Sequence, residues 1–171
     1  MKLGLDIGRV IITPEGQGGD TSFLGGSIDD AMRTPPNVGM FEAVGELCER
    51  FGGQVWLVSK CGPRVQEKTR RWLAHHRFFR RTGIPAANLR FCLLRPQKAI
   101  HCRELGLTHF VDDRQDVLGY LAGVVQHRYL FGPQRRGQQT PRGLTPCLTW
   151  AQTRATIIAD IESAGEGDSA T

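Results

Sequence analysis

The sequence predicts an α/β domain built on a mainly parallel sheet. Two observations indicate this class: short apolar runs alternate with amphipathic stretches along the whole chain, and three of the apolar runs end abruptly in polar residues. Such alternation is typical of βαβ units, in which a helix connects two parallel strands. Ligands of these sheets bind at the carboxyl ends of the strands, so the polar residues there are the candidate site.

The expected elements follow one another in the order that this class requires. The first strand lies in an apolar stretch that reaches Ile12 and is interrupted by Asp6. Further strands are expected over residues 54–58, 89–94, 107–111 and 124–131. The helical spacing of apolar residues predicts helices from Pro36 to the Gly52–Gly53 pair and over residues 64–80, 95–105, 117–122 and 148–161. Residues 132–146 are expected to form a loop.

At 171 residues the chain has the size of one domain and can bury a core without disulfide or metal staples. We assign residues 1–162 to this domain and expect residues 163–171 to be a disordered polar tail. Residues 13–36 are rich in glycine, and we interpret them as a flap-like excursion over the site, including a short hairpin between residues 10–12 and 22–24. A loop without function is the alternative. No interval between the polar strand ends has room for a large cap domain.

Composition limits where the protein works and what it binds. No apolar run is long enough to cross a bilayer, and Asp6 interrupts the early apolar run that a secretory signal would need. The five cysteines are scattered, which predicts reduced thiols in a cytoplasmic protein. The net charge is +5. Many of the cations lie in residues 64–81 and 128–142, which we interpret as a solvated helix face and a basic loop. Binding of nucleic acid is the weaker alternative, because no aromatic residues interleave the charges.

The candidate site residues are Asp6, Ser59, Lys98 and the adjacent pair Asp112 and Asp113. Each has a simple structural interpretation: a turn residue, a helix N-cap, a surface lysine and a solvated acidic pair. Their combination at neighbouring strand ends favours phosphoryl chemistry. The three carboxylates offer the hard oxygen ligands that Mg²⁺ prefers. A serine with the N–H groups that follow it suits a phosphoryl oxygen, and a lysine neutralises developing charge.

This order of residues resembles the haloacid dehalogenase (HAD)-like superfamily. The resemblance runs from Leu3-Gly4-Leu5-Asp6 through the run ending in Ser59, and on to Phe110-Val111-Asp112-Asp113. It implies a Rossmann-like three-layer sandwich and a Mg²⁺-dependent phosphomonoesterase without a large cap domain. The implied roles are nucleophile for Asp6, which forms an aspartyl-phosphate, charge-neutralising base for Lys98, phosphate ligands for Ser59, Lys60 and Arg9, and metal ligands for Asp6, Asp112 and Asp113. The spaced form of the acidic motif would use Asp116.

One position departs from the pattern of the family's phosphatases. They carry a second aspartate two residues after the nucleophile as general acid and base, and here that residue is Gly8. Its backbone carbonyl can still ligate the metal, but it cannot move a proton, and a positioned acid or base typically contributes about 10²–10⁴-fold in rate. Substitute proton carriers would be His75, His76, Asp116 or water.

The expected function is therefore a HAD-like hydrolase that acts on a phosphorylated small molecule or macromolecule. The alternative is a non-catalytic module that binds metal and a phosphorylated ligand or partner because Gly8 has removed turnover. A nucleic-acid end is a weaker candidate ligand. The sequence does not indicate an oligomeric state.

Overall fold

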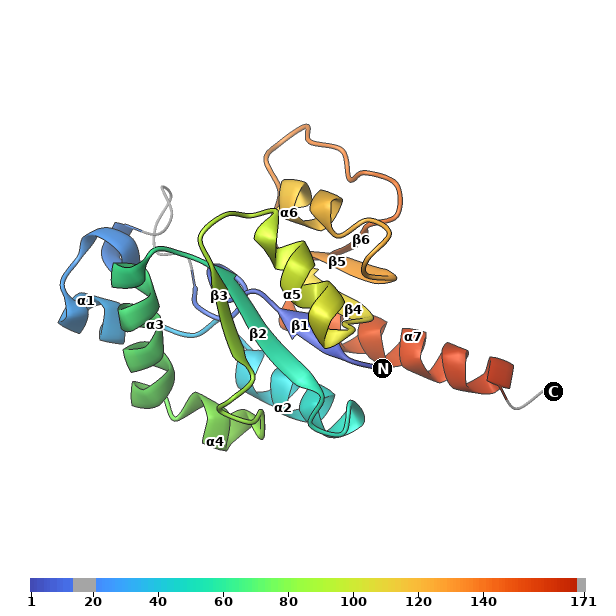
Figure 1. Cartoon of the computed structure of the whole chain (residues 1–171), viewed down its shortest axis with the longest axis horizontal. Helices are drawn as coiled ribbons and strands as arrows, with labels where there is room; N and C mark the ends of the chain where they lie inside the picture. Colours follow the sequence, from blue (N-terminus) through green and yellow to red (C-terminus); the bar gives the residue numbers. More distant parts are fainter. Residues whose placement is uncertain (14–20, 169–171) are drawn as a thin grey trace.

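The computed structural model describes residues 1–13 and 21–168. Within these residues, six parallel strands form one sheet in the order β3-β2-β1-β4-β5-β6 (Figure 1). Their bounds are Leu3–Leu5 (β1), Val55–Lys60 (β2), Leu89–Cys92 (β3), His109–Asp112 (β4), His127–Phe131 (β5) and Thr145–Cys147 (β6). This is the strand order of doubly wound sheets, in which the order reverses between the first and fourth strands.

Helices cover both faces of the sheet, so the protein is a Rossmann-like three-layer α/β domain. The described helices are η1, a π-helix (Thr21–Gly25), α1 (Ile28–Arg33), α2 (Met40–Arg50), α3 (Pro63–His75), α4 (Phe78–Thr82), α5 (Gln97–Leu105), α6 (Gln115–Tyr120) and α7 (Trp150–Asp168). Helices α5 and α6 pack on one face, and α2, α4 and α7 lie on the other (Figure 1).

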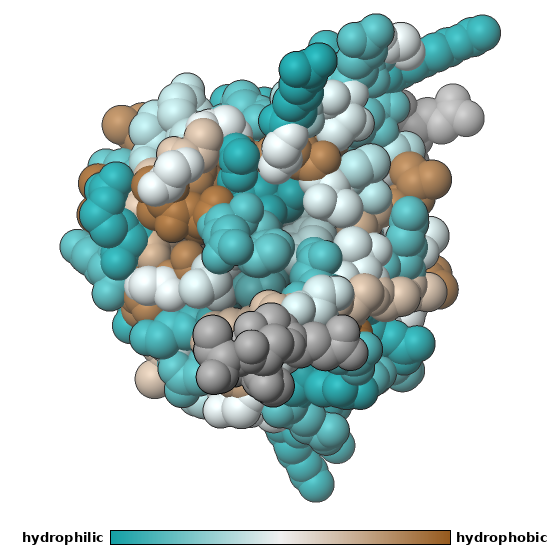
Figure 2. Space-filling model, turned by 90° about the vertical axis from the view of Figure 1, so that its right-hand side faces the viewer, coloured by the Kyte–Doolittle hydropathy of each residue, from teal (hydrophilic) through white to brown (hydrophobic). Residues whose placement is uncertain are grey.

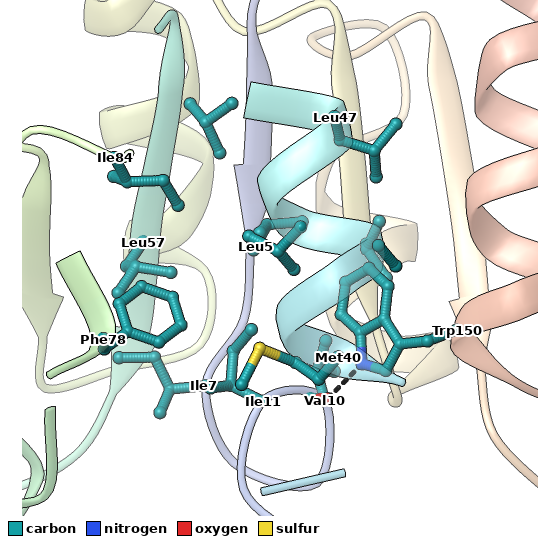
Figure 3. Packing of buried hydrophobic residues seen from close by; sticks show 14 of the residues in the cluster. Leu5, Ile7, Val10, Ile11, Met40, Leu47, Leu57, Phe78, Ile84 and Trp150 are labelled. Carbon is teal, nitrogen blue, oxygen red and sulfur yellow. Dashed lines mark hydrogen bonds between the residues drawn. The ribbon is translucent and has the colours of Figure 1, made fainter. Parts of the chain in front are cut away.

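Alternation along the strands divides the core into two clusters. In β2, Val55 and Leu57 join the cluster under α2 and α7, whereas Trp56 and Val58 face α5 and α6. The period of two in a strand places successive side chains on opposite faces, and a sheet covered on both sides therefore needs continuous apolar runs. Figure 3 shows the first cluster, in which side chains of the sheet and of α2 pack against Trp150.

The turn after β1 is fixed by the core. Indole Nε1 of Trp150 donates a 2.8 Å hydrogen bond to the carbonyl of Val10, which is drawn in Figure 3. Amide Nδ2 of Asn37 donates to the same carbonyl at 2.8 Å and to that of Arg9 at 2.7 Å. Because these partners come from distant parts of the chain, the path of the residues directly after Asp6 is set by tertiary contacts.

Several sequence expectations were wrong in detail. The hairpin between residues 10–12 and 22–24 does not form, because residues 21–25 are a π-helix and Ile12 instead bridges Pro36. The helix expected over 64–80 is two helices, separated at Arg77, whose backbone is left-handed (φ +52°). The loop over 132–146 ends in strand β6, which the sequence analysis missed.

Helices occur in the two segments that were expected to be a flap-like excursion and a polar tail. The flap-like excursion over 13–36 contains η1 and α1, while residues 14–20 lie outside the described part. The last helix continues to Asp168, seven residues beyond the expected end at residue 161 and into the segment expected to be a tail. Residues 169–171 are not described.

Figure 2 shows the face that lies on the right-hand side of Figure 1, on which hydrophobic residues form separate patches among hydrophilic ones. Among the described residues, no helix has the length and apolarity needed to span a membrane.

Candidate active site

The centre of the candidate site lies between β1 and β4. These strands are hydrogen-bonded neighbours, with Leu5 paired to Val111, so their carboxyl ends place Asp6 and Asp112 side by side. The amide of Asp6 donates to the carbonyl of Val111 at 3.0 Å, which continues the pairing one residue beyond β1. This is the point where the strand order reverses, and doubly wound sheets bind their ligands there.

Lys98 joins the two carboxylates from the first turn of α5. Its Nζ lies 2.6 Å from Oδ1 of Asp6 and 2.8 Å from Oδ2 of Asp112. Its side chain is only 2% exposed, so the interpretation as a surface lysine was wrong. Burial alone lowers the pKa of an ammonium, but the charges of Asp112 and Asp6 outweigh it, and the pKa of Lys98 is raised above its ordinary value. Lys98 therefore stays charged.

The acidic pair lies in two different environments. Asp112 is fully buried, and its second oxygen accepts the amide N–H of Arg114 at 3.0 Å. Asp113 faces the cleft, with Oδ2 4.0 Å from Nε of Arg9. Burial raises the pKa of both carboxyls, and the negative charge of Asp6 raises each of them further. The side chains thus form a site with an excess of negative charge.

These three carboxylates fit a divalent cation. Asp6, Asp112 and Asp113 each offer an oxygen, and the three oxygens lie within 4.8 Å of one another. Oxygen-only ligands at the end of a sheet suit Mg²⁺, which keeps several of its waters and takes one or two carboxylates. Gly8 lines the same cleft. Asp116 lines the neighbouring groove instead and pairs with Arg95 at 3.5 Å and Arg114 at 3.1 Å, so the spaced form of the acidic motif is not assembled here.

A small cleft of about 230 Å³ opens beside the carboxylates. Ser59 and Lys60 line it from the end of β2, and Arg9 lines it from the turn after β1. Ser59 is the fifth residue of β2 and the N-cap of α3 is Gly62, so the interpretation of Ser59 as a helix N-cap was wrong. The structure thus brings Ser59, Lys60 and Arg9 to the cleft that holds the carboxylates.

The sequence analysis missed one residue that shapes this cleft. Lys68 was assigned to a solvated basic face, yet it is 2% exposed. Its Nζ donates to the backbone carbonyls of Phe23 (3.0 Å), Leu24 (3.3 Å) and Gly26 (2.6 Å). Phe23 and Leu24 line the cleft, so a lysine of α3 holds one of its walls in place. The only sequence signal was its position four residues before the buried Trp72, on the same face of the helix.

The same face of α3 makes two further contacts, both to the end of α1, which follows the segment that lines the cleft. One turn on, Nε1 of Trp72 donates to the carbonyl of Thr34 at 2.8 Å, and in the following turn Nε2 of His76 lies 3.2 Å from the carbonyl of Met32. His76 is thereby engaged far along α3, and neither it nor His75 lines the small cleft. The expectation that these histidines carry protons at the site was wrong.

A second, larger groove adjoins the cleft. Its volume is about 1040 Å³, and it shares Arg9, Asp113 and Arg114 with the small cleft. Arg135 and the exposed side chains of Val38 and Leu148 line its outer part. Arg9 and Arg114 therefore lie where the small cleft meets this groove.

The cysteines contribute no nucleophile to the site. All five are buried and unpaired. Cys61 and Cys92 lie near Asp6, and burial raises the pKa of both thiols, in the case of Cys61 to about 11. A thiol with a raised pKa stays protonated and is a poor nucleophile.

The site and fold together define a class of protein: a Rossmann-like α/β domain with a lysine-bridged carboxylate cluster at its topological switch point. No protein-family model matches the sequence, and no curated protein is significantly similar to it. Solved structures do match.

One of these structures is D,D-heptose 1,7-bisphosphate phosphatase from B. bronchiseptica, complexed with magnesium and phosphate. The TM-score is 0.65 at 16% sequence identity, over 94% of this chain and 99% of that chain. At this identity the similarity establishes the fold alone, the three-layer α/β arrangement described above.

Proposed function

We propose that the protein is a Mg²⁺-dependent HAD-like phosphohydrolase that works through an aspartyl-phosphate on Asp6. The observation that supports this most directly is the bridge from Lys98 to Asp6 and Asp112, with Asp113 beside it. A buried lysine between two carboxylates places positive charge beside Asp6, where it offsets the charge of the nucleophile and of the phosphoryl group. The phosphatase with a similar fold was crystallised with magnesium and phosphate, which is consistent with this chemistry.

Each residue of the cleft has a role in this proposal. Asp6 attacks the phosphorus with the oxygen that does not bind Lys98, and Lys98 offsets the charge that develops on the phosphoryl oxygens. Ser59, Lys60 and Arg9 orient the phosphoryl group. Asp6, Asp113, Asp112 and the carbonyl of Gly8 would hold Mg²⁺, which when bound supplies further charge neutralisation. The substrate is a phosphorylated small molecule or a phosphorylated macromolecule, and a cytoplasmic location remains a prediction.

The second candidate function is a non-catalytic module that binds metal and a phosphorylated ligand. Gly8 favours it, because a glycine cannot donate or accept the proton that the family's second aspartate moves. Among the described residues, neither His75 nor His76 lines the cleft and Asp116 lines the neighbouring groove, so of the expected substitute proton carriers water remains.

A phosphatase assay with Mg²⁺ on wild type, Asp6→Asn and Gly8→Asp separates the two candidates. A hydrolase predicts turnover by wild type that falls below detection in Asp6→Asn, together with a covalent phosphoryl group on Asp6 in the trapped enzyme. A silent wild type combined with an active Gly8→Asp variant would contradict the hydrolase and favour the binding module. Urea unfolding of all three proteins serves as the control for folding.

A further inference from the structure

The glycine at position 8 is not required by the backbone or by packing. A Cβ built on Gly8 meets no heavy atom within 4 Å, and its φ is not in the left-handed region. A side chain would therefore fit. Glycine here changes the chemistry of the cleft without being needed for the fold, and the missing carboxylate limits the substrates that a HAD-like site can cleave.

The missing proton donor matters most for basic leaving groups. An alkoxide that departs from an ordinary phosphomonoester is about as basic as hydroxide, whose conjugate acid has a pKa of about 15.7. It must be protonated as the bond breaks, which is the task of a general acid. A phosphate that departs from a phosphoanhydride has a pKa of about 6 and leaves as a stable anion. Such a leaving group needs positive charge beside it, and it needs no proton.

Two arginine side chains lie where the leaving group would pass. Arg9 and Arg114 line both the small cleft and the large groove, so they lie at the junction of the two. Their side chains are 46% and 47% exposed. Arg114 also donates to Asp116 at 3.1 Å, and a ligand phosphate would compete with that exposed carboxylate. A guanidinium stays charged at all physiological pH values and binds phosphate through two parallel N–H donors.

The backbone of Arg9 is a second, independent observation. Arg9 has φ +63°, and a left-handed conformation is uncommon for a residue with a side chain. The hydrogen bond from Asn37 to its carbonyl, and those from Asn37 and Trp150 to the next carbonyl, hold this turn in place. Strained backbone of this kind clusters at functional sites, where it aims a side chain. Here the side chain of Arg9 is aimed at the junction.

From these observations, and resting on the hydrolase proposed above, we propose that the substrates are phosphoanhydrides whose leaving phosphate enters the large groove against Arg9 and Arg114. In the first step an oxygen of Asp6 forms a bond to the terminal phosphorus. The bond from that phosphorus to the bridging oxygen breaks, and the electron pair leaves with the departing phosphate, which takes no proton from the protein.

The second step follows from the same glycine. Water attacks the aspartyl-phosphate, the bond between phosphorus and Asp6 breaks, and the proton of the water passes to solvent or to a phosphoryl oxygen. No side chain at position 8 assists the water, so this step is slow relative to the first. The phosphoenzyme therefore accumulates, and the first turnover appears as a burst of leaving group.

The test uses two nucleotides that differ in the leaving group. With Mg²⁺, ADP releases AMP when its terminal phosphorus is attacked, whereas AMP must release the alkoxide of adenosine. We expect kcat/KM for ADP to exceed that for AMP by at least about 100-fold, in line with the usual contribution of a general acid. A burst of AMP close to one per enzyme, together with one phosphoryl group on Asp6 by mass spectrometry, is expected as well.

Variants connect the preference to the named residues. Gly8→Asp should lower the ratio of the ADP to the AMP rate at least about 100-fold, because it restores the proton donor. Arg9→Gln and Arg114→Gln should each slow ADP hydrolysis about tenfold more than hydrolysis of p-nitrophenyl phosphate, whose leaving group carries no phosphate. Arg71→Gln, on the exposed face of α3 and outside both cavities, is the control.

The outcomes separate the two proposals. Hydrolysis of ADP and AMP at similar rates, both abolished by Asp6→Asn, would overturn the phosphoanhydride preference and leave the hydrolase intact. No turnover of ADP, AMP or p-nitrophenyl phosphate and no phosphoenzyme would overturn both. An unchanged substrate ratio in Gly8→Asp, in a protein whose urea unfolding matches wild type, would also contradict the inference.

Discussion

Lys98 and Asp6 are 92 positions apart in the sequence, yet Nζ of Lys98 lies 2.6 Å from Oδ1 of Asp6. A second carboxylate, Asp112, completes the bridge at 2.8 Å. The contact depends on three elements at once, because Asp6 directly follows β1, Asp112 ends β4 and Lys98 lies in α5. This bridge places a buried cation beside the candidate nucleophile and links the fold to the proposed chemistry.

Removal of Lys98 should damage stability and activity together. Lys98→Met leaves Asp6 and Asp112 buried without their cation, and breaking a buried ion pair by removing one partner typically costs about 3–5 kcal/mol. We expect the free energy of unfolding in urea to fall by this amount and any phosphatase activity to be lost. Arg71→Met, which removes an exposed pair with Glu67, is the control and should cost less than about 1 kcal/mol. Equal stability of the two variants would contradict the structure of the bridge.

Gly4 should be far less tolerant of a methyl group than Gly8. A Cβ at Gly4 would lie 2.7 Å from Cδ1 of Leu107 and closer still to the ring of Phe110, inside the packed core. Overpacking of a core costs about 1–3 kcal/mol, so Gly4→Ala should lower the free energy of unfolding by at least that much. Gly8→Ala is the matched variant, with open space around its Cβ. Chemical denaturation measures both, and a Gly4→Ala protein as stable as Gly8→Ala would show that β1 and β4 pack differently.

Lys68 should control the order of the wall formed by residues 21–34. Lys68→Met keeps the apolar stem but leaves the carbonyls of Phe23, Leu24 and Gly26 without their donor, and an unsatisfied buried polar group costs about 1–3 kcal/mol. We expect faster hydrogen exchange in residues 21–34 and earlier proteolytic cleavage there, at denaturant concentrations where the sheet remains folded. Arg64→Met, an exposed cation on the same helix, provides the comparison. Protection of residues 21–34 equal to wild type would show that the contacts of Lys68 do not hold this wall.

His109 should make the protein sensitive to acid. Its ring is 2% exposed and stacks on His127 at 4.4 Å, with Nδ1 2.8 Å from Oγ1 of Thr108. Burial, and then the charge of His127, lowers the pKa of His109 to about 4, although Asp160 opposes this shift. Between pH 4 and its ordinary value of about 6.5 the unfolded chain binds a proton here that the folded protein does not. The stability is therefore fully present above pH 6.5 and decreases as the pH falls, by about 3 kcal/mol at pH 4.

The measurement is urea unfolding from pH 4 to pH 7. The variant His109→Phe removes the titrating group while keeping an aromatic ring, and should show a smaller loss of stability on acidification. His75→Gln, an exposed histidine of α3, should retain the full pH dependence. Identical pH dependence in wild type and His109→Phe would show that other groups cause the acid sensitivity.

The alternation of apolar strands with amphipathic helices was sufficient to predict the fold class, because a sheet buried on both faces leaves a local pattern in the sequence. The same pattern placed Asp6 and the Asp112–Asp113 pair at strand ends, and the rule for ligand sites in such sheets then brought them together. The sequence was less informative for residues 21–36, where η1 and α1 form without a long periodic signal. The short strand β6 contains Pro146 and was missed for the same reason.

The sequence by itself determined the α/β class, the strand ends that carry the site and the absence of a carboxylate at Gly8. Tertiary structure alone decided which lysines are buried: Lys98 bridges two carboxylates and Lys68 caps backbone carbonyls, although both resemble surface residues in their local sequence. It also decided that Arg9 and Arg114 both line the junction of the two cavities. The physical reason is that strand pairing and helix packing are local patterns, whereas the partners of a charged side chain come from segments that only the folded chain brings together.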